Sequence, residues 1–133
     1  MAVRPREPFG NMRFRLEIER MEEGGAVEAI LPEARWDSTA GGRRSAHYGP
    51  LVLRRGVTRS REWFEWWNQA RRAKPDPKRN VVVVLLDAEG EDVHHWHFAR
   101  CEPLAYQLSP LHALGNLPLI ETLELRVGGF TLE

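Results

Sequence analysis

The sequence of 133 residues contains only one cysteine, Cys101. A single thiol cannot form an internal disulfide or supply a pair of zinc ligands, so we expect Cys101 to be a small buried residue in a reducing compartment. The chain also lacks any apolar run of ~18–20 residues, the length that a membrane-spanning helix needs. No apolar signal segment opens the sequence, and we therefore expect cytoplasmic assembly without membrane insertion.

The chain has no net charge either, because 19 Lys and Arg residues balance 19 Asp and Glu residues. A uniformly basic surface for nucleic acid is therefore not expected, although two local basic clusters occur at 54–61 and 71–79. The nearby tryptophans fall on a helical face that we expect to be buried, where bases cannot stack on them. Nucleic acid is thus not favoured as a specific ligand.

Alternating apolar and polar residues predict short strands within a single domain spanning residues 1–133. The first strand alternates Phe14, Leu16 and Ile18 with Arg13, Arg15, Glu17 and Glu19. Further strands are predicted at 26–36 (weak, interrupted by Pro32), 51–54, 81–86, 94–100 and 119–127. The segment 81–86 is apolar on both faces, as in a strand covered from both sides. Turns are expected at 21–25 and 87–90, the latter with Gly90 at positive φ.

One helix is predicted from Ser60 to about residue 72. The Ser60 hydroxyl is a suitable N-cap acceptor. The apolar positions Trp63, Trp66, Trp67 and Ala70 follow the spacing i, i+3, i+4, i+7 and define one bulky face for burial. The proline-containing segment 74–78 stops the helix. Residues 37–47 are small and polar with Gly41-Gly42 at their centre, which indicates a loop with Arg43 and Arg44 at its tip.

The histidines are the strongest candidates for chemistry. His95 and His97 are two residues apart on a predicted strand, so they project to one face and could chelate a metal ion. A third ligand would have to come from Asp92, His47, His112 or Cys101, none of which lies at a recognisable spacing. Paired histidines without a carboxylate cluster are usually solvated or interfacial. We therefore expect no metal, no cofactor and no catalytic site.

Four segments, in this order, resemble the tail-tube proteins of contractile phage tails and related injection systems. They are the opening strand at 8–19, the segment YGPLVLRRGVTRSREWFEWW at 48–67, the hairpin at 80–98 and the close at 115–130. The second segment carries the most information, because it runs from Tyr-Gly through a strand and Arg-Arg-Gly-Val-Thr into a tryptophan-bearing helix. The segments together span most of the chain.

The resemblance implies a mainly β fold with one α-helix, a barrel or sandwich whose sheets join between subunits into a ring. It further implies a structural subunit of the inner tube, in stacked hexameric rings around a channel. Sheath and baseplate proteins, and cargo in the channel, would be its partners. Such a ring satisfies exposed strand edges and leaves a polar face towards the channel. The residues assigned to the channel are Arg13, Arg15, Glu17, Glu19, Thr122, Glu124 and Arg126, and those assigned to subunit contacts are Arg43, Arg44, Tyr48, Arg54, Arg55 and Gly56.

Other interpretations stay open. The loop 37–47 is shorter than the corresponding family loop and lacks its Leu-Pro-Gly element, which would suit a paralogue that initiates the tube at the baseplate. The chain could also be a small monomeric binding module whose polar faces meet only solvent. A metal-dependent enzyme centred on His95 and His97 is the third alternative. Self-assembly distinguishes a tube protein from the binding module and from the enzyme.

Overall fold

The computed structural model describes residues 7–10, 13–22 and 25–133, which contain nine strands and one helix. The elements are β1 (Phe14–Ile18), β2 (Ala26–Ile30), β3 (Ala34–Ser38), β4 (Arg44–Tyr48), β5 (Leu51–Gly56), α1 (Glu62–Arg72), β6 (Arg79–Leu86), β7 (Asp92–Leu108), β8 (Ile120–Arg126) and β9 (Gly129–Leu132). Asn11 and Met12 of the predicted opening strand and residues 23–24 of the predicted turn lie outside the described residues. The mainly β fold with one helix is confirmed.

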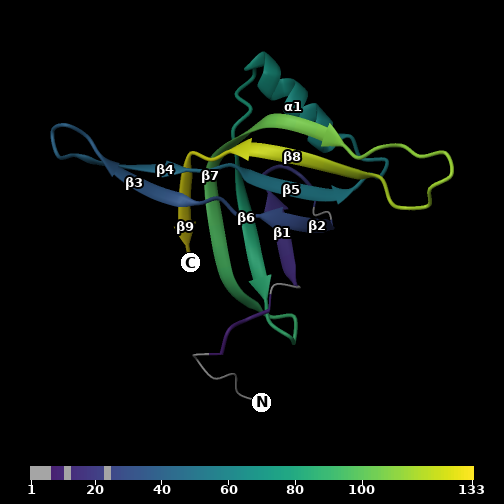
Figure 1. Cartoon of the computed structure of the whole chain (residues 1–133), viewed down its shortest axis with the longest axis horizontal. Helices are drawn as coiled ribbons and strands as arrows, with labels where there is room; N and C mark the ends of the chain where they lie inside the picture. The colour runs from purple at the N-terminus through teal and green to yellow at the C-terminus, as the bar shows by residue number, and fades with distance from the viewer. Residues whose placement is uncertain (1–6, 11–12, 23–24) are drawn as a thin grey trace.

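Seven strands form one bent antiparallel sheet with two arms. Its order is β1-β6-β7-β8-β5-β2, and β9 also pairs with β7. The first half of β7 pairs with β6 and β9, whereas residues 102–108 pair with β8. In Figure 1, β6 and the first half of β7 run vertically, while β5 and β8 run horizontally. We call β1, β6, β9 and the first half of β7 the first arm, and β2, β5, β8 and residues 102–108 the second arm. The sheet order has two ends, so the described residues of one subunit do not close a barrel.

The core lies on the face of this sheet that α1 covers. Leu51 and Leu53 of β5 pair with Leu125 and Leu123 of β8, and all four side chains are fully buried. Trp63 and Trp66 of α1 are each 1% exposed, which confirms the predicted helical face. The remaining buried residues of the cluster are Leu16, Ile18, Val81, Val83, Phe98, Cys101 and Val127. The alternation predicted for the first strand is confirmed, because Leu16 and Ile18 enter the core while Arg15 and Glu17 do not.

The helix begins two residues later than predicted. Arg61 is its N-cap and makes no capping hydrogen bond through its side chain. The Ser60 hydroxyl instead accepts a hydrogen bond from the backbone N–H of Glu62 at 3.3 Å, one position before the cap. At the other end, Ala73 adopts a left-handed conformation with φ of 61°, and its N–H donates to the Gln69 carbonyl. The breaker at 74–78 follows directly.

The prediction for residues 26–47 is wrong in two ways. The single strand 26–36 is two strands in different sheets, because Pro32 falls between β2 and β3. The loop 37–47 is mostly a hairpin, in which β3 and β4 form a separate two-stranded sheet. Gly42 supplies a positive φ of 77° in its turn, and Thr39 N–H donates to the Arg43 carbonyl. Every residue of β3 is exposed, so the sequence carries no alternation to reveal the strand.

The C-terminal half was also only partly predicted. The turn with Gly90 at positive φ is confirmed, at 84°. The strand expected at 94–100 continues to Leu108, past Arg100 at φ 52° and past Pro103. In a sequence, a proline such as Pro103 indicates the end of a strand or an edge strand. The short strand β9 follows β8 and pairs with residues 96–99 of β7, and the sequence prediction did not include it.

Candidate functional site

The second arm presents a polar face on the side opposite its core. Thr122, Glu124 and Arg126 of β8 alternate there with the buried leucines, as predicted. Arg126 Nη2 lies 2.6 Å from Glu102 Oε1 in an ion pair. On the neighbouring strands, Arg54 pairs with Glu28 through Nη1 and Oε1 at 3.3 Å. This face therefore carries both charge signs next to one another.

The first arm has a polar face of its own, built around Arg15. Its guanidinium makes two hydrogen bonds to Asp92, at 3.0 and 2.9 Å, and a third to Glu17 at 2.8 Å. These contacts to Arg15, together with a contact from His95, hold the pKa of Asp92 below its usual range. Val84 pairs with Arg15 and with His95 in the strand register and is only 1% exposed. Arg15, Glu17 and Asp92 therefore already pair with one another within the chain.

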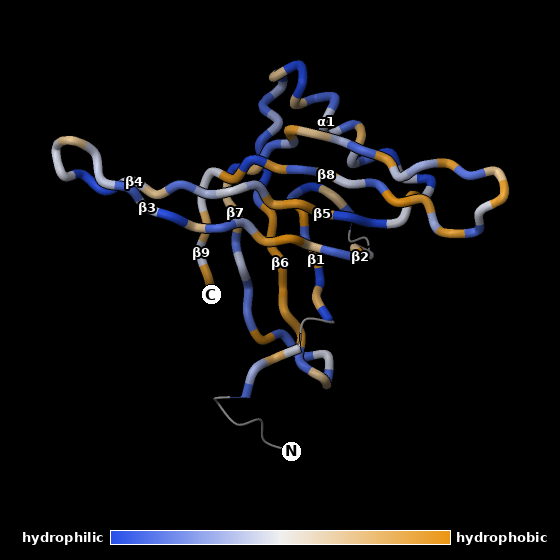
Figure 2. Tube along the Cα trace, viewed as in Figure 1, coloured by the Kyte–Doolittle hydropathy of each residue, from blue (hydrophilic) through white to orange (hydrophobic). Residues whose placement is uncertain are grey.

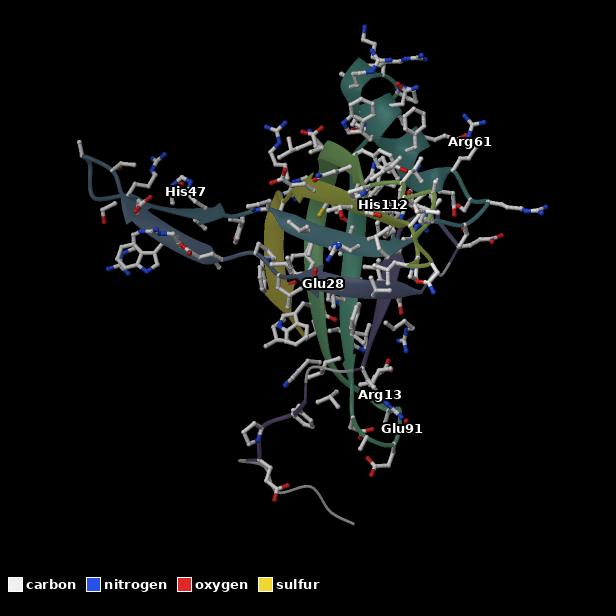
Figure 3. The ribbon with its side chains drawn as sticks, turned by 45° about the vertical axis from the view of Figure 1, so that its right-hand side comes forward. Arg13, Glu28, His47, Arg61, Glu91 and His112 are labelled. Carbon is white, nitrogen blue, oxygen red and sulfur yellow. The ribbon has the colours of Figure 1, made fainter. Side chains whose placement is uncertain are left out.

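The residues assigned to the channel fall on different arms. Arg13 lies just before β1 and donates from Nη1 to the Ala88 carbonyl at 3.2 Å, beside the turn that carries Glu91 in Figure 3. Glu19 follows β1 and accepts a hydrogen bond from the Asn80 N–H at 2.9 Å. The set of Arg13, Arg15, Glu17 and Glu19 therefore belongs to the first arm, and the set of Thr122, Glu124 and Arg126 belongs to the second. The structure does not bring the two sets together.

The residues assigned to subunit contacts also separate. Arg43 is exposed in the hairpin turn, and the Arg44 guanidinium carbon lies 4.4 Å from the centroid of the Trp36 ring. Figure 3 shows the same hairpin, with His47, projecting away from the sheet. Tyr48, at the base of the hairpin, is half-buried, and its ring stacks on Phe130 with centroids 6.2 Å apart. Arg43 and Arg44 are thus the exposed arginines of this set, and Arg44 lies against Trp36.

Arg55 is placed inside the subunit. It is 7% exposed, and its Nε lies 2.6 Å from Glu121 Oε2 in an ion pair on the core face. The guanidinium carbon lies 4.3 Å from the Trp63 ring centroid, and the Tyr106 hydroxyl donates to Glu121 Oε1 at 2.7 Å. We call these four residues the Arg55 cluster. Arg55 is thus not available at the surface for a contact with a neighbour. Gly56 is the last residue of β5 and pairs with Ile120 of β8.

The Arg55 cluster was not predicted, although the sequence contains a signal for it. Glu121 occupies the same alternation phase as Leu123 and Leu125, which places a carboxylate on the core face of β8. A buried carboxylate requires a partner of opposite charge. Arg55 stands in the same phase as Leu51 and Leu53 on β5, directly across from Glu121. Reading both strands for charges in the apolar phase would have found the pair.

The Arg55 cluster predicts an effect of high pH. Burial and the hydrogen bond to Glu121 raise the pKa of Tyr106 to about 12. In the unfolded chain a tyrosine titrates near ~10, so the folded state holds the proton more tightly. This stabilisation is present below pH ~10 and is lost as the pH rises towards 12. Replacing Tyr106 by Phe should lower the free energy of unfolding at pH 7 by ~1.5–3 kcal/mol, because the bond to a carboxylate is lost. Urea unfolding at pH 7 and at pH 10–12 measures both effects, and an unchanged pH profile in Tyr106→Phe would contradict the assignment.

The described residues contain no group of three or more His, Cys, Asp or Glu side chains that could hold a metal ion. His95 and His97 do share one face, with ring centroids 6.3 Å apart, and His97 Nε2 lies 3.2 Å from a Glu133 carboxylate oxygen. Cys101 is fully buried, and burial raises the pKa of its thiol to about 12. His47 lies on the projecting hairpin, away from this pair (Figure 3).

Within the described ranges, no helix is long and apolar enough to cross a membrane.

Comparison with known proteins gives a consistent result. The family model described as T4-like virus tail tube protein gp19 matches residues 10–131. No curated protein has a sequence that matches this chain. A chain in the cryo-EM structure of an extracellular contractile injection system, the PVC sheath/tube terminator in its extended state, superposes with a TM-score of 0.78 at 17% identity, covering 99% of both chains.

Two further solved structures share the fold. A chain of the anti-feeding prophage (AFP) baseplate superposes with a TM-score of 0.70 at 23% identity, covering 100% of this chain and 97% of that one. Hcp1 from Flavobacterium johnsoniae superposes with a TM-score of 0.65 at 16% identity, covering 90% and 93%. The predicted tube-protein fold is therefore confirmed.

Proposed function

The chain belongs to the T4-like virus tail tube protein family, and on that premise we propose that it forms stacked hexameric rings around a central channel. The family is one of structural tube proteins, so the chain's chemistry is that of assembly. Its first partner is a second copy of itself. Sheath and baseplate proteins would contact the outside of the tube, and cargo would occupy the channel. The observation that carries this proposal is the pair of free strand edges on the second arm.

These two edges lie at opposite ends of one four-stranded run. β2 pairs on one side with β5, and residues 102–108 of β7 pair on one side with β8. Among the described residues, no strand pairs with the other side of either segment. Exposed edges present unpaired N–H and C=O groups that seek a partner strand. Joining β2 of one subunit to residues 102–108 of the next would close the second arms into a continuous ring of strands.

Closure through these edges sets which polar face lines the channel. The second arm would then form the wall, with Thr122, Glu124 and Arg126 towards the water-filled interior. Its mixed charges would leave the channel without a strong net field. The helix α1 covers the opposite, core face of the second arm. It would therefore lie on the outside of the tube; in Figure 1 it is seen next to the second half of β7 at the top of the molecule. The polar face around Arg15 on the first arm is then not required for the lining.

A second candidate function is a tube initiator at the baseplate. Of the three structures compared above, the one with the highest identity, 23%, is a chain of the AFP baseplate. An initiator meets different neighbours on its two sides, so it would form single rings without extending them. Rod formation by the purified protein therefore separates the two functions.

The arginines at the hairpin turn provide a test of the predicted contact surface. We expect Arg43→Glu combined with Arg44→Glu to weaken assembly, because the two exposed cations would become anions and would repel the acidic groups that the arginines meet on a neighbour. Each exposed ion pair is worth only ~0–1 kcal/mol, so the shift in critical concentration is modest for one contact and grows with the number of contacts per ring. Arg71→Glu combined with Arg72→Glu, at the exposed end of α1, is the matched control. Light scattering against protein concentration measures the shift. If both variants assembled equally well, the assignment of the hairpin arginines to the interface would be wrong.

Negative-stain electron microscopy, with size-exclusion chromatography of the same sample, tests the proposed function. We expect rings or hollow rods of uniform width. A tube subunit should give rods whose length grows with concentration, and an initiator should give rings alone. A monomer that stays monodisperse at every concentration, and also in the presence of preformed tube ends, would overturn both assignments.

A further inference from the structure

The loop that joins β7 to β8 exposes three leucines almost completely. Leu111, Leu114 and Leu117 have relative exposures of 84%, 102% and 89%. Residues 109–118, which we call the leucine tip, contain no Asp, Glu, Lys or Arg. In Figure 2 the tip is the loop with separate orange stretches that projects beyond the start of β8. An exposed apolar cluster of this kind marks a surface that a partner covers.

The leucine tip has a defined conformation. At its base, Ser109 N–H donates to the Ile120 carbonyl, and Ile120 N–H donates to the Ser109 hydroxyl, both at 2.9 Å. Within the tip, Gly115 N–H donates to the His112 carbonyl at 3.0 Å. A Cβ at Gly115 would lie 3.0 Å from the His112 Cβ, so this turn is tight. A preformed apolar loop loses little conformational entropy on binding.

The other end of the subunit also lacks cover. The β3–β4 hairpin extends from the sheet at the opposite end of the molecule's longest axis (Figure 1). Both of its faces are solvent-facing, and Trp36 is 58% exposed. An isolated two-stranded hairpin is only marginally stable in water. The hairpin therefore gains stability from any surface that packs on it.

We propose that the leucine tip of one subunit packs against the β3–β4 hairpin of a second copy in the next ring, with Trp36 in the contact. This inference rests on the proposed function. If the second arms join edge to edge around the ring, the ends of their strands point to its two rims. The tip and the hairpin lie at opposite ends of the subunit, and so at opposite rims. Rings stacked in the same orientation bring them together, and such a heterologous contact propagates into a filament.

The chemistry of the two surfaces favours this pairing. The tip is uncharged, so it needs an apolar or aromatic receiver rather than an oppositely charged one. Trp36 is the only tryptophan among the large apolar side chains that the described residues leave exposed. The Arg44 guanidinium carbon lies over this ring at 4.4 Å from its centroid, so the cation covers one face of the indole and the leucines would approach the other. An aromatic ring against leucine side chains buries much apolar area at low entropic cost.

Replacing the three tip leucines by serine tests the proposal. Leu111→Ser, Leu114→Ser and Leu117→Ser in one chain should leave the subunit folded, because these side chains make almost no contact within it. We expect single rings to form and rods to be lost. The matched control replaces the same three leucines by Met, which keeps the surface apolar and should retain rods. Electron microscopy and sedimentation velocity distinguish rings from rods, and thermal unfolding confirms that all chains fold.

A cross-link identifies the receiver. Cys101 is fully buried and does not compete, so Leu114→Cys and Trp36→Cys can be combined in one chain. Oxidation of assembled rods should give a ladder of covalent oligomers, whereas each single variant should not, because the contact joins unlike ends. Rods that form normally without a ladder would overturn the pairing.

The possible results separate this inference from the proposed function. Wild-type protein that forms neither rings nor rods counts against the function itself. Wild-type rods together with unchanged rods from the serine variant overturn only the tip contact. Serine-variant rods that assemble fully but no longer recruit sheath protein would assign the tip to the sheath, and would also overturn contact with a second copy.

Discussion

Replacing Glu121 by alanine is expected to destabilise the folded subunit by ~3–5 kcal/mol, because it leaves the Arg55 charge buried without a counter-ion. Arg55 and Glu121 are 7% and 3% exposed, so both charges are largely removed from bulk solvent. The Tyr106 hydroxyl loses its acceptor in the same variant. Such a loss is a large part of the ~5–15 kcal/mol that stabilises a typical domain. Urea unfolding followed by tryptophan fluorescence gives the free energy directly.

Two companion variants make this prediction specific. Glu124→Ala lies on the same strand but on the polar face, and it should change stability by less than ~0.5 kcal/mol, as exposed substitutions usually do. Replacing both partners, Arg55→Met with Glu121→Leu, should recover most of the loss, because no unpaired charge remains. If Glu121→Ala were as stable as Glu124→Ala, the ion pair would not be buried as described.

Lysines on the free edge of β2 are expected to abolish ring formation while leaving the subunit folded. Val27 and Ile30 are 60% and 50% exposed on this edge strand, so Val27→Lys with Ile30→Lys removes little packing. Charged edge residues are a common means of blocking strand addition. Loss of even two backbone hydrogen bonds at each junction would cost ~1–3 kcal/mol, about one to two orders of magnitude in association. Every junction of a ring carries this penalty, so the combined effect is the largest expected on assembly.

The control for the edge variant adds the same charge elsewhere. Phe9→Lys with Val57→Lys changes two exposed apolar residues, 42% and 38% exposed, that lie on neither free edge. This control should form rings at the concentration of the wild type. Size-exclusion chromatography with light scattering measures both variants. Rings from the β2 variant at wild-type concentrations would show that β2 is not a junction.

The elements that face the core were predictable from the sequence. In β1, alternation distinguishes Leu16 and Ile18 from the polar residues between them, and in α1 the spacing of Trp63 and Trp66 identifies the buried face. Asp87 to Gly90 is short and has a glycine where the chain needs positive φ, so the turn was identifiable. In each case the local sequence pattern matches the burial or the backbone conformation that the residues have in the fold.

The elements that we propose for assembly were harder to predict. The β3–β4 hairpin buries neither face in the subunit, so nothing in its sequence alternates. The second half of β7 contains Pro103, which suits an edge strand but reads as a strand end. The leucines of the tip suggest burial by their composition, yet they are exposed. A sequence pattern reports what a residue contacts in the assembled state, and one subunit contains only part of those contacts.

The most direct test of the central claim is a cryo-EM reconstruction of the assembled protein at side-chain resolution. We expect sixfold rings in which β2 of each subunit pairs with residues 102–108 of its neighbour, so that the second arms form one continuous wall. Thr122, Glu124 and Arg126 should then face the channel. Rings in which either edge stays unpaired, or in which the face around Arg15 lines the channel instead, would contradict the account.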